Sequence, residues 1–382
     1  MARKTSEELN ALKKKHRVND IYSWSRYNTY VNSTYEYLLK YVLRIREDRK
    51  DGIYSQSGGS VHDILERFYL KEISYEQMID EYDTALLQFN LSELKYDRCN
   101  DNKNAKIADK YEACIQHFFR NHIPVTKKAE LERFITIWVN KFLFQGYIDF
   151  MHVEDGYYII TDFKTSTIYT GKKIDKEKGQ LVLYAEGIRQ LGVPIEKIKI
   201  RWAFVKYVTV VIQQANGKSA ERNILRSEIG ESLTSNIKMW LNKSNQYTEN
   251  EVDSYLNLVV QTNSIDCLPE DIKQKYIIKD CYVEIPINQE VIDELKQKVN
   301  DTLIEIHKKV LLYNQNKDDK VFWEEVTQEQ SYYFANLCGY SGFLHKPYGE
   351  YLDKFNAQQE NSGSGDDKEE DDLDDFSWLN EL

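Results

Sequence analysis

The sequence has few cysteines, and their spacing excludes the sites that cysteine usually builds. Five occur in 382 residues, and none forms a C-x-x-C pair. An odd number at irregular spacing provides neither a disulfide framework nor a zinc site. We therefore expect ordinary thiols in a reducing compartment.

Long apolar runs are also absent. No stretch approaches the roughly 20 apolar residues that a membrane-spanning helix needs, and the first 20 residues lack the apolar centre of a secretion signal. We expect a cytoplasmic protein with no membrane contact. With 41% hydrophobic and 30% charged residues, the chain can form two or three domains, or one core with insertions.

An excess of positive charge is lacking, because the net charge is −11. Residues 366–382 hold nine acids and one lysine, a net charge of −8, so the rest of the chain carries only −3. A nearly balanced body can still contain a basic groove for nucleic acid. The 28 tyrosines, with abundant Asn, Lys and Ile, are typical of an AT-rich genome such as that of a phage or a low-GC bacterium.

The apolar pattern predicts a mixed α/β protein with mostly helical flanks. Residues 22–45 have helical spacing after serines that can cap a helix. Gly58, Gly59 and Ser60 precede a second predicted helix whose first turn contains His62, and further helices are expected to about residue 143.

The period then changes to that of strands. A β-hairpin is expected, with strands near 143–153 and 157–163 around a turn at residues 154–156. The next expected elements are a helix over 176–191, strands over 197–205 and 208–214, a mostly helical region over 224–315 with an extended piece near 281–287, and an aromatic-rich segment over 320–355.

The hairpin carries the residues that matter for chemistry. Paired antiparallel strands could set Asp149 and Asp162 side by side, and two close carboxylates repel each other unless a cation lies between them. Oxygen ligands on a rigid scaffold suit Mg²⁺ or Mn²⁺. Lys164 shares a face with Asp162, where its ammonium could orient a water and stabilise charge on a phosphate. Gln180 and Tyr184, four residues apart on the next helix, could reach the same cavity.

These segments resemble the PD-(D/E)XK nuclease superfamily, and specifically its RecB-like branch. The matching segments, in chain order, are "GSVHDILE" (59–66), "GYID" (146–149), "DFK" (162–164) and "QLVLY" (180–184), after a helix that resembles the first helix of that branch. The resemblance extends over roughly residues 20–345, and it is loose in the middle and after residue 215. It implies a restriction-endonuclease-like core, a mixed central sheet flanked by helices, with large helical additions at both ends.

The resemblance also implies roles for individual residues. Asp149 and Asp162 would bind the metal together with the backbone carbonyl of Phe163, and His62 would supply a further ligand. Lys164 would serve the attacking water, while Gln180 and Tyr184 would contact the substrate phosphate or Lys164. An upstream acid, Glu130 or Glu132, would support the site. Taken alone, a histidine placed like His62 is usually a core histidine, and Gln180 and Tyr184 could equally be ordinary helix-surface residues.

Two further expectations concern the surroundings of this site. Lys172, Lys173 and Lys176 either form a solvated loop with Lys178 or contact DNA phosphates. Many relatives hold an iron–sulfur cluster, but here Ser33-Thr34 occupies the N-terminal cysteine position and Cys338 is alone at the C-terminal one. We expect no cluster, because it needs four thiolates, and we expect packing by the aromatic residues Tyr333, Phe334, Tyr340 and Phe343 in its place.

The acidic C-terminus is the last feature. Such a block is expected to be disordered and serves either as a solubilising tail or as an interaction tail. Its tip also carries apolar residues in a pattern that a short helix could present to a protein. The candidate partner-binding residues are Leu373, Phe376, Trp378, Leu379 and Leu382. A sliding clamp, a helicase or a polymerase could be the partner, and self-inhibition of the nuclease groove is a third alternative.

Together these patterns predict three regions: a flexible lead-in over 1–20, a nuclease domain over 21–356 with core motifs in 58–66 and 143–214, and a linker with an acidic tail over 357–382. The expected function is Mg²⁺- or Mn²⁺-dependent DNA hydrolysis, by an exonuclease in recombination, repair or replication. The alternative is a nuclease-fold scaffold that binds DNA or a partner without cutting. A structure with no metal-sized gap, or a His62 turned away from the carboxylates, would favour the scaffold.

Overall fold

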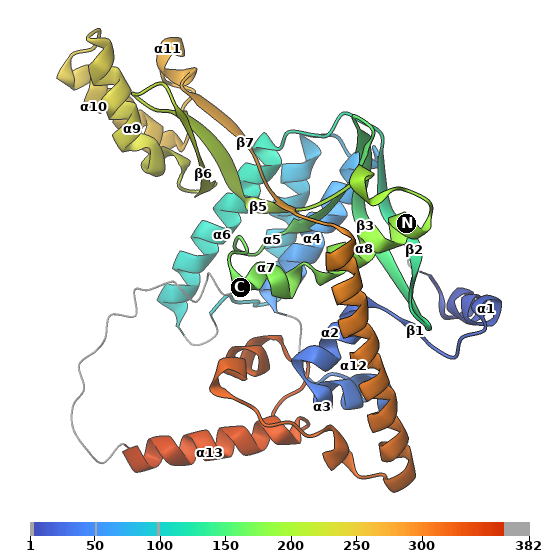
Figure 1. Ribbon diagram of the computed structural model, residues 1–382. Coiled ribbons are helices and arrows are strands. Elements are labelled where there is room, and N and C mark those ends of the chain that lie inside the picture. Colours follow the sequence, from blue (N-terminus) through green and yellow to red (C-terminus); the bar gives the residue numbers. More distant parts are fainter. Residues whose placement is uncertain (1–3, 50–51, 98–99, 363–382) are drawn as a thin grey trace.

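A computed structural model describes residues 4–49, 52–97 and 100–362 of the chain. Its centre is a mixed seven-stranded sheet (Figure 1). The strands are β1 (Ile21–Tyr22), β2 (Ala129–Val139), β3 (Phe142–Glu154), β4 (Tyr157–Lys164), β5 (Ile198–Gln213), β6 (Ser219–Leu225) and β7 (Tyr276–Ile285). The order β1-β3-β4-β5-β6 runs through the sheet, β2 pairs with β3, and β7 pairs with β5. The β1–β3 and β4–β5 pairs are parallel and the others are antiparallel.

Helices flank this sheet. The α-helices are α1 (Ser6–His16), α2 (Trp24–Asn32), α3 (Thr34–Tyr37), α4 (Ile53–Tyr69), α5 (Gln77–Leu91), α6 (Asp101–Asn121), α7 (Lys172–Glu177), α8 (Gly179–Gln190), α9 (Ile229–Ser244), α10 (Glu249–Thr262), α11 (Glu270–Lys273), α12 (Gln289–Asn316) and α13 (Lys346–Ser362). None of the helices in the described ranges is both long and apolar enough to cross a bilayer.

The two faces of the sheet bury separate apolar cores. Helices α4, α5 and α6 pack over Phe150, Phe163 and Val205 on one face. Helices α2, α8 and α12 pack over Ile160 and Trp202 on the other. Successive side chains of a strand point to opposite faces, so a strand inside such a sheet supplies both cores. The expected fold class, a central mixed sheet flanked by helices, is confirmed.

A third core belongs to a lobe beyond the sheet. It contains β6, α9, α10, α11 and the adjoining ends of β5 and β7, which extend away from the sheet as long arms (Figure 1). Leu233, Ile237 and Leu241, on one side of α9, are fully buried against Val259 and other apolar residues. The part of the expected helical region that forms α9, α10 and α11 is therefore a distinct packing unit on the arms of the sheet, whereas α12 packs on the sheet itself.

The hairpin that carries the candidate carboxylates forms as expected. Strands β3 and β4 meet at a turn in which Asp155 and Gly156 have positive φ, of 49° and 78°. Glycine adopts this left-handed conformation without steric cost, and Asp tolerates it better than most residues. Helices α7 and α8 follow, where one helix was expected.

Two of the expected elements were wrong. Residues 129–139 form strand β2, although helices were expected up to 143. Ile135, Ile137 and Val139 are buried at a spacing of two, which is the period of a strand. The two strands expected over 197–214 are one long strand, β5, whose pairing with β7 is irregular between Ala203 and Val208.

The limits of three other segments also differ from the expectation. Gly58 and Gly59 lie inside α4, which begins at Ile53, so His62 is not in its first turn. The lead-in contains α1, which begins with a capping box between Thr5 and Glu8. Helix α13 continues into the expected linker as far as Ser362.

Candidate active site

The two candidate carboxylates lie on neighbouring strands. The register of the hairpin pairs Phe150 with Thr161, and Asp149 and Asp162 are the next residues on the two strands. Their carboxyl groups are within hydrogen-bonding reach of each other. The Asp162 side chain is 7% exposed and that of Asp149 is 18% exposed, so only Asp149 has appreciable contact with solvent.

Lys164 neutralises one of these carboxylates. Its Nζ lies 2.8 Å from Asp162 Oδ2. Burial would raise the pKa of Asp162, but the charge of Lys164 and the hydrogen bonds with Asp149 and Lys164 together outweigh burial and lower it. Burial would likewise lower the pKa of Lys164, but Asp162 and Tyr169 outweigh it and raise it. Asp162 and Lys164 therefore form a stable buried ion pair.

Asp149 has the opposite electrostatic environment. Its pKa is raised well above the usual range, first by burial and then by the charge of Asp162. The pair thus carries more negative charge than Lys164 alone compensates, and an added cation would relieve it. This imbalance, together with the hard oxygen donors, fits a divalent metal ion.

His62 reaches the same point from α4, on one face of the sheet. Its Nε2 lies 2.9 Å from the main-chain oxygen of Phe163, and its Nδ1 lies 3.4 Å from Asp149 Oδ2. Burial lowers the pKa of His62, so the imidazole is neutral near pH 7 and able to act as a metal ligand. The four candidate metal ligands, His62, Asp149, Asp162 and Phe163, therefore lie close together in the structure.

The four candidate ligands do not form a closed metal-coordination shell in the observed arrangement. Within the described residues there is no cluster of three or more His, Cys, Asp or Glu side chains that could hold a metal ion. In the observed arrangement Nε2 of His62 bonds to the Phe163 carbonyl and Lys164 bonds to Asp162. The donors that could hold a metal are therefore Asp149, Asp162 and the Phe163 carbonyl, with His62 after its ring turns.

Helix α8 closes the other side of the site. Gln180 Nε2 donates to Tyr184 Oη at 3.0 Å. Burial raises the pKa of Tyr184, and the charges of Asp149 and Asp162 raise it further. Tyr184 therefore stays protonated and faces the carboxylates. Gln180 contacts the site through Tyr184 in this arrangement.

Of the two upstream acids, Glu132 lies near the site and Glu130 does not. Strand pairing sets Leu131 beside Phe150 and Arg133 beside Ile148, which leaves Glu132 next to Asp149. Its φ is 44°, an unusual value for a residue other than glycine, and such strain often marks functional sites. Its charge contributes to the raised pKa of Asp149. Glu130 is instead paired with Arg133.

The candidate phosphate-binding lysines lie on α7. Lys172 and Lys176 are exposed, while Lys173 is half-buried with its Nζ 5.2 Å from the centre of the Tyr169 ring. Tyr169 is a neighbour of the site that the sequence analysis did not identify, although it follows Lys164 by only five residues. Burial raises the pKa of Tyr169, and Lys164 opposes that effect.

Hydrogen bonds occupy the position where an iron–sulfur cluster was considered. Ser33 is fully buried, and its Oγ lies 2.5 Å from Glu324 Oε1 and 2.8 Å from His345 Nε2. Phe334 and Tyr340 are buried nearby, but Phe343 is 90% exposed, so its expected packing role was wrong. The candidate partner-binding residues from 373 to 382 lie outside the described residues.

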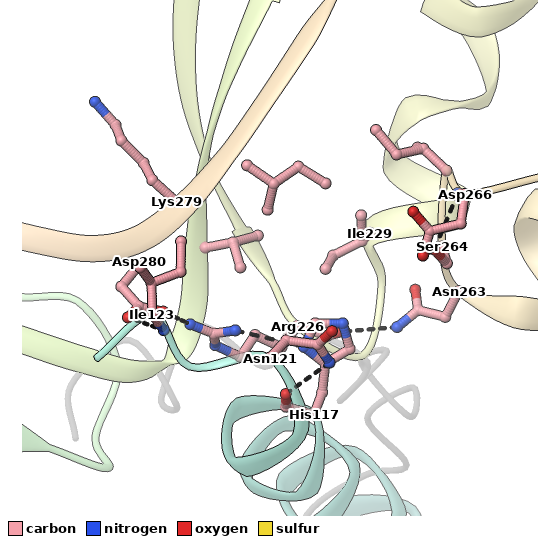
Figure 2. Close-up of a pocket in the computed structure, with 13 residues that line it drawn as sticks. His117, Asn121, Ile123, Arg226, Ile229, Asn263, Ser264, Asp266, Lys279 and Asp280 are labelled. Atoms are coloured by element: carbon pink, nitrogen blue, oxygen red, sulfur yellow. Dashed lines mark hydrogen bonds and ion pairs between the residues drawn. The ribbon is translucent and has the colours of Figure 1, made fainter. Parts of the chain in front are cut away.

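A separate cavity lies away from this site. It measures about 190 Å³ and is bordered by α6, the ends of β5 and β7, and the loop after α10 (Figure 2). Its polar wall is a buried network in which Arg226 pairs with Asp280 and also contacts His117. None of the carboxylates of the candidate active site lines it.

Comparison with known proteins agrees with this geometry. A search of curated proteins found no match. The family model described as "PD-(D/E)XK nuclease superfamily" matches residues 22–318, which is more than half of the chain and includes His62, both carboxylates, Lys164 and α8. The chain, with its acid pair and lysine at the end of a β-hairpin between α4 and α8, therefore belongs to the PD-(D/E)XK nuclease superfamily.

Proposed function

We propose that the protein is a metal-dependent DNA nuclease of the RecB-like branch, acting as an exonuclease in recombination, repair or replication. One observation carries the proposal: Asp149, Asp162, Lys164 and His62 converge at the end of one hairpin. Members of this superfamily typically use divalent ions such as Mg²⁺ or Mn²⁺. The position of His62 on a helix before the hairpin supports the RecB-like assignment.

In the proposed reaction each side chain has a distinct task. Asp149 and Asp162 would hold the divalent ion, which supplies positive charge to the phosphate oxygens during hydrolysis. Lys164, fixed by Asp162 at 2.8 Å, would orient the attacking water and stabilise charge that develops on the phosphate. Tyr184 would donate a hydrogen bond to the substrate, because its hydroxyl stays protonated.

The orientation of His62 favours this enzyme over the scaffold alternative. A scaffold has no need to keep a histidine against two acceptor oxygens, yet both ring nitrogens of His62 face oxygens of Asp149 and Phe163. Burial and the charge of Asp162 raise the pKa of Asp149, so its ionised form costs folding free energy, as is expected where a cation binds. We also propose that the acidic tail carries a docking segment for a protein partner.

The decisive experiment is a cleavage assay with purified full-length protein. Linear end-labelled DNA and circular DNA are incubated with Mn²⁺, and the products are separated on a gel. Mononucleotides from linear DNA, with intact circles, support an exonuclease. Asp162→Asn is the inactive control, and Asp155→Asn, in the exposed hairpin turn, is the matched control that keeps activity. Equal cleavage by wild type and Asp162→Asn would contradict the proposed site.

A further inference from the structure

A groove lies beside the first turn of α8, the helix that closes one side of the active site. It measures about 310 Å³ and is bordered by α2, the junction of α7 and α8, and α12 (Figure 1). None of the candidate metal ligands lines it, so it is a separate feature of the surface. Pockets that hold small molecules measure roughly 300–1,000 Å³, so this groove is large enough for one nucleotide.

One wall of the groove is aromatic. Trp24, the first residue of α2, lines it together with Tyr27, and the centres of their rings are 5.0 Å apart. A Cβ atom added to Gly179 would lie 2.1 Å from Cη2 of Trp24, so the indole rests directly on the backbone of α8. Val291 and Leu295 of α12 extend the apolar surface. A ring that is fixed in this way can stack with a nucleic-acid base, because every base has a π-face.

The rest of the lining is charged. Three lysines (Lys176, Lys178 and Lys298) and two acids (Asp175 and Glu294) border the groove, which leaves an excess of one positive charge. Lys178 pairs with Asp175. Lys176 and Lys298 are exposed, and neither has an ion-pair partner in the described parts of the chain. Two unpaired ammonium groups beside an apolar wall complement a ligand that carries both a phosphate and a flat ring.

The groove reaches the active site along α8. Gly179, which borders the groove, is followed directly by Gln180, whose Nε2 donates to Tyr184 Oη at 3.0 Å. Tyr184 packs against Gly146 on β3, three residues before Asp149. A DNA strand with one phosphate at the carboxylates can therefore place a nearby nucleotide in the groove.

The aromatic wall distinguishes a single strand from a duplex. Lysines that contact phosphates accept either form, because both forms present the same backbone groups. A base can stack on a protein ring only after it leaves the stack and the pairing of a duplex, which costs a few kcal/mol, whereas an unpaired base is already available. The combination of Trp24 with the two lysines therefore favours unpaired DNA.

We propose that this groove binds one unpaired nucleotide of a single-stranded DNA segment, with its base stacked on Trp24 and a backbone phosphate held by Lys176 and Lys298. The inference rests on the proposed nuclease function for the identity of the ligand. It adds a substrate class to that function, namely DNA with a single-stranded segment next to the bond that is cut.

Binding is measured by fluorescence anisotropy in EDTA, with labelled oligothymidylate and with a duplex of the same length. Trp24→Leu is expected to weaken binding of the single strand about tenfold and to leave duplex binding unchanged. Lys298→Met should also weaken binding of the single strand and should lower the salt slope of log K by about 0.7. An unchanged affinity of Trp24→Leu for the single strand, or an equal loss with the duplex, would overturn the proposal.

The matched controls are distant from the groove. Trp240→Leu changes a tryptophan of the lobe, and Lys308→Met changes an exposed lysine about 15 Å further along α12. Both should bind the single strand as wild type does. Because Lys298 is exposed, Lys298→Met should unfold at the wild-type temperature, so this variant tests the groove even if Trp24→Leu folds poorly.

A crosslinking experiment on the wild-type protein reports the stacking contact directly. An oligonucleotide that contains 5-iododeoxyuridine is bound in EDTA and irradiated, and the attached residues are identified by mass spectrometry. Attachment at Trp24 is expected, since the halogenated base would lie against its ring. Attachment only at residues outside the groove would reject the stacking contact.

A small substrate separates the groove from the chemistry. Bis(p-nitrophenyl) phosphate is a phosphodiester without bases, so Trp24→Leu should hydrolyse it with Mn²⁺ at the wild-type rate and should show a raised KM only for single-stranded DNA. A wild-type protein that binds single strands through Trp24 but cuts neither substrate would reject the nuclease function and leave the groove standing. An active protein with unchanged binding in both groove variants would do the reverse. A wild-type dimer that Trp24→Leu dissociates, with DNA binding unchanged, would assign the groove to a second copy of the chain and overturn the proposal.

Discussion

A Cβ atom added to Gly146 would lie 2.4 Å from Cε1 of Tyr184, so these two residues pack together only because position 146 has no side chain. Gly146 lies on β3, three residues before Asp149. The glycine of the "GYID" segment therefore makes room for the aromatic ring that closes the active site. This contact joins α8 to the hairpin at the point where the carboxylates are held.

Gly146→Ala is expected to reduce cleavage by at least about tenfold, because Tyr184 and its partner Gln180 must move by more than the site tolerates. The free energy of unfolding should fall by about 1–3 kcal/mol, the usual cost of overpacking. The measurements are kcat and KM on linear DNA and the midpoint of urea unfolding.

The matched control is Gly59→Ala on α4, the helix that carries His62. A Cβ atom there meets nothing within 4 Å. Alanine at this exposed helical position should keep activity and increase stability by up to about 1 kcal/mol. If both variants behaved alike, the contact with Tyr184 would not matter for function.

Asp149→Asn should separate activity from stability. The variant is expected to lose at least about 100-fold in cleavage, because one of the two carboxylates is gone. Its free energy of unfolding in EDTA should nevertheless rise, because the raised pKa of Asp149 means that its buried charge opposes folding.

The stability difference between Asp149→Asn and wild type should depend on pH in a definite direction. A carboxyl group with a raised pKa binds its proton more tightly in the folded state, so it reduces stability as pH rises above the unfolded value of about 3.9. The advantage of Asp149→Asn over wild type should therefore be absent below about pH 4 and should grow toward neutral pH. Urea unfolding across this range measures it, with Asp155→Asn as the exposed control. A variant less stable than wild type at pH 7 would contradict the account.

Local sequence patterns were sufficient to predict the hairpin and the cluster at its end. The alternation of β3 and β4 and the turn at Gly156 depend on neighbouring residues, and the pairing of Asp149 with Asp162 follows from that turn. The sequence spacing also predicted that Lys164 and the helix with Gln180 and Tyr184 face the same carboxylates. The family match covers the stretch of chain that contains these motifs.

Features that depend on distant contacts could not be predicted in this way. Strand β2 is defined by pairing with β3, and its charged first half hid the strand period. Glu132 comes close to Asp149 through an unusual backbone conformation. Lys206 looks like an ordinary polar residue of a strand until Tyr111 of α6 packs against it and buries it. No spacing rule reports burial of this kind.

The network around Asp280 supplies a separate prediction about stability. Asp280 accepts from His122 Nδ1 at 2.8 Å. It also accepts from the amide of Ile123 at 3.2 Å and pairs with Arg226 (Figure 2). Asp280→Asn should cost about 3–5 kcal/mol of unfolding free energy at pH 7, because Arg226 is 1% exposed and would lose its counter-charge.

Acid should remove this difference. Burial would raise the pKa of Asp280, but His122 and Arg226 outweigh burial and lower it. A carboxyl group with a lowered pKa stabilises the fold above the unfolded value of about 3.9, and it loses that contribution as pH falls through the folded value. In urea unfolding at decreasing pH, the difference between wild type and Asp280→Asn should begin to narrow below about pH 4 and should disappear only below the folded pKa of Asp280. Asp253→Asn, exposed on α10, should parallel wild type throughout.

The buried Ser33 cluster leads to a prediction about cofactors. Protein purified without oxygen should be colourless and free of bound iron, because Ser33 and Cys338 cannot supply four thiolates. Ser33→Ala should lower stability by about 1–3 kcal/mol, since Glu324 and His345 lose a partner in a buried site. The matched control is Ser341→Ala. Ser341 donates an exposed hydrogen bond to Asp48, so its replacement should lower stability by less. A brown preparation with bound iron would contradict the prediction.

Truncation after Gly365 tests the role of the acidic tail. Removing residues 366–382 is expected to leave stability and DNA cleavage close to wild type, because the nuclease motifs all lie before residue 190. The same truncation should abolish binding to one protein partner. The acidic residues alone would keep the tail soluble, whereas Trp378 and the leucines near it do not contribute to solubility. A short segment that orders on binding can anchor through a few apolar residues while its acids approach a basic surface.

Trp378→Ala should reproduce most of that loss, because a buried tryptophan commonly dominates a small interface. Ser377→Ala, next to it, is the control that keeps the charge and the apolar residues. A purified sliding clamp is the first partner to test, by isothermal titration with full-length, truncated and Trp378→Ala protein. Equal binding by all three would reject docking through the tail. A severalfold rise in cleavage on truncation, with no change in partner binding, would instead assign the tail to self-inhibition, in which its acids compete with DNA for the active site.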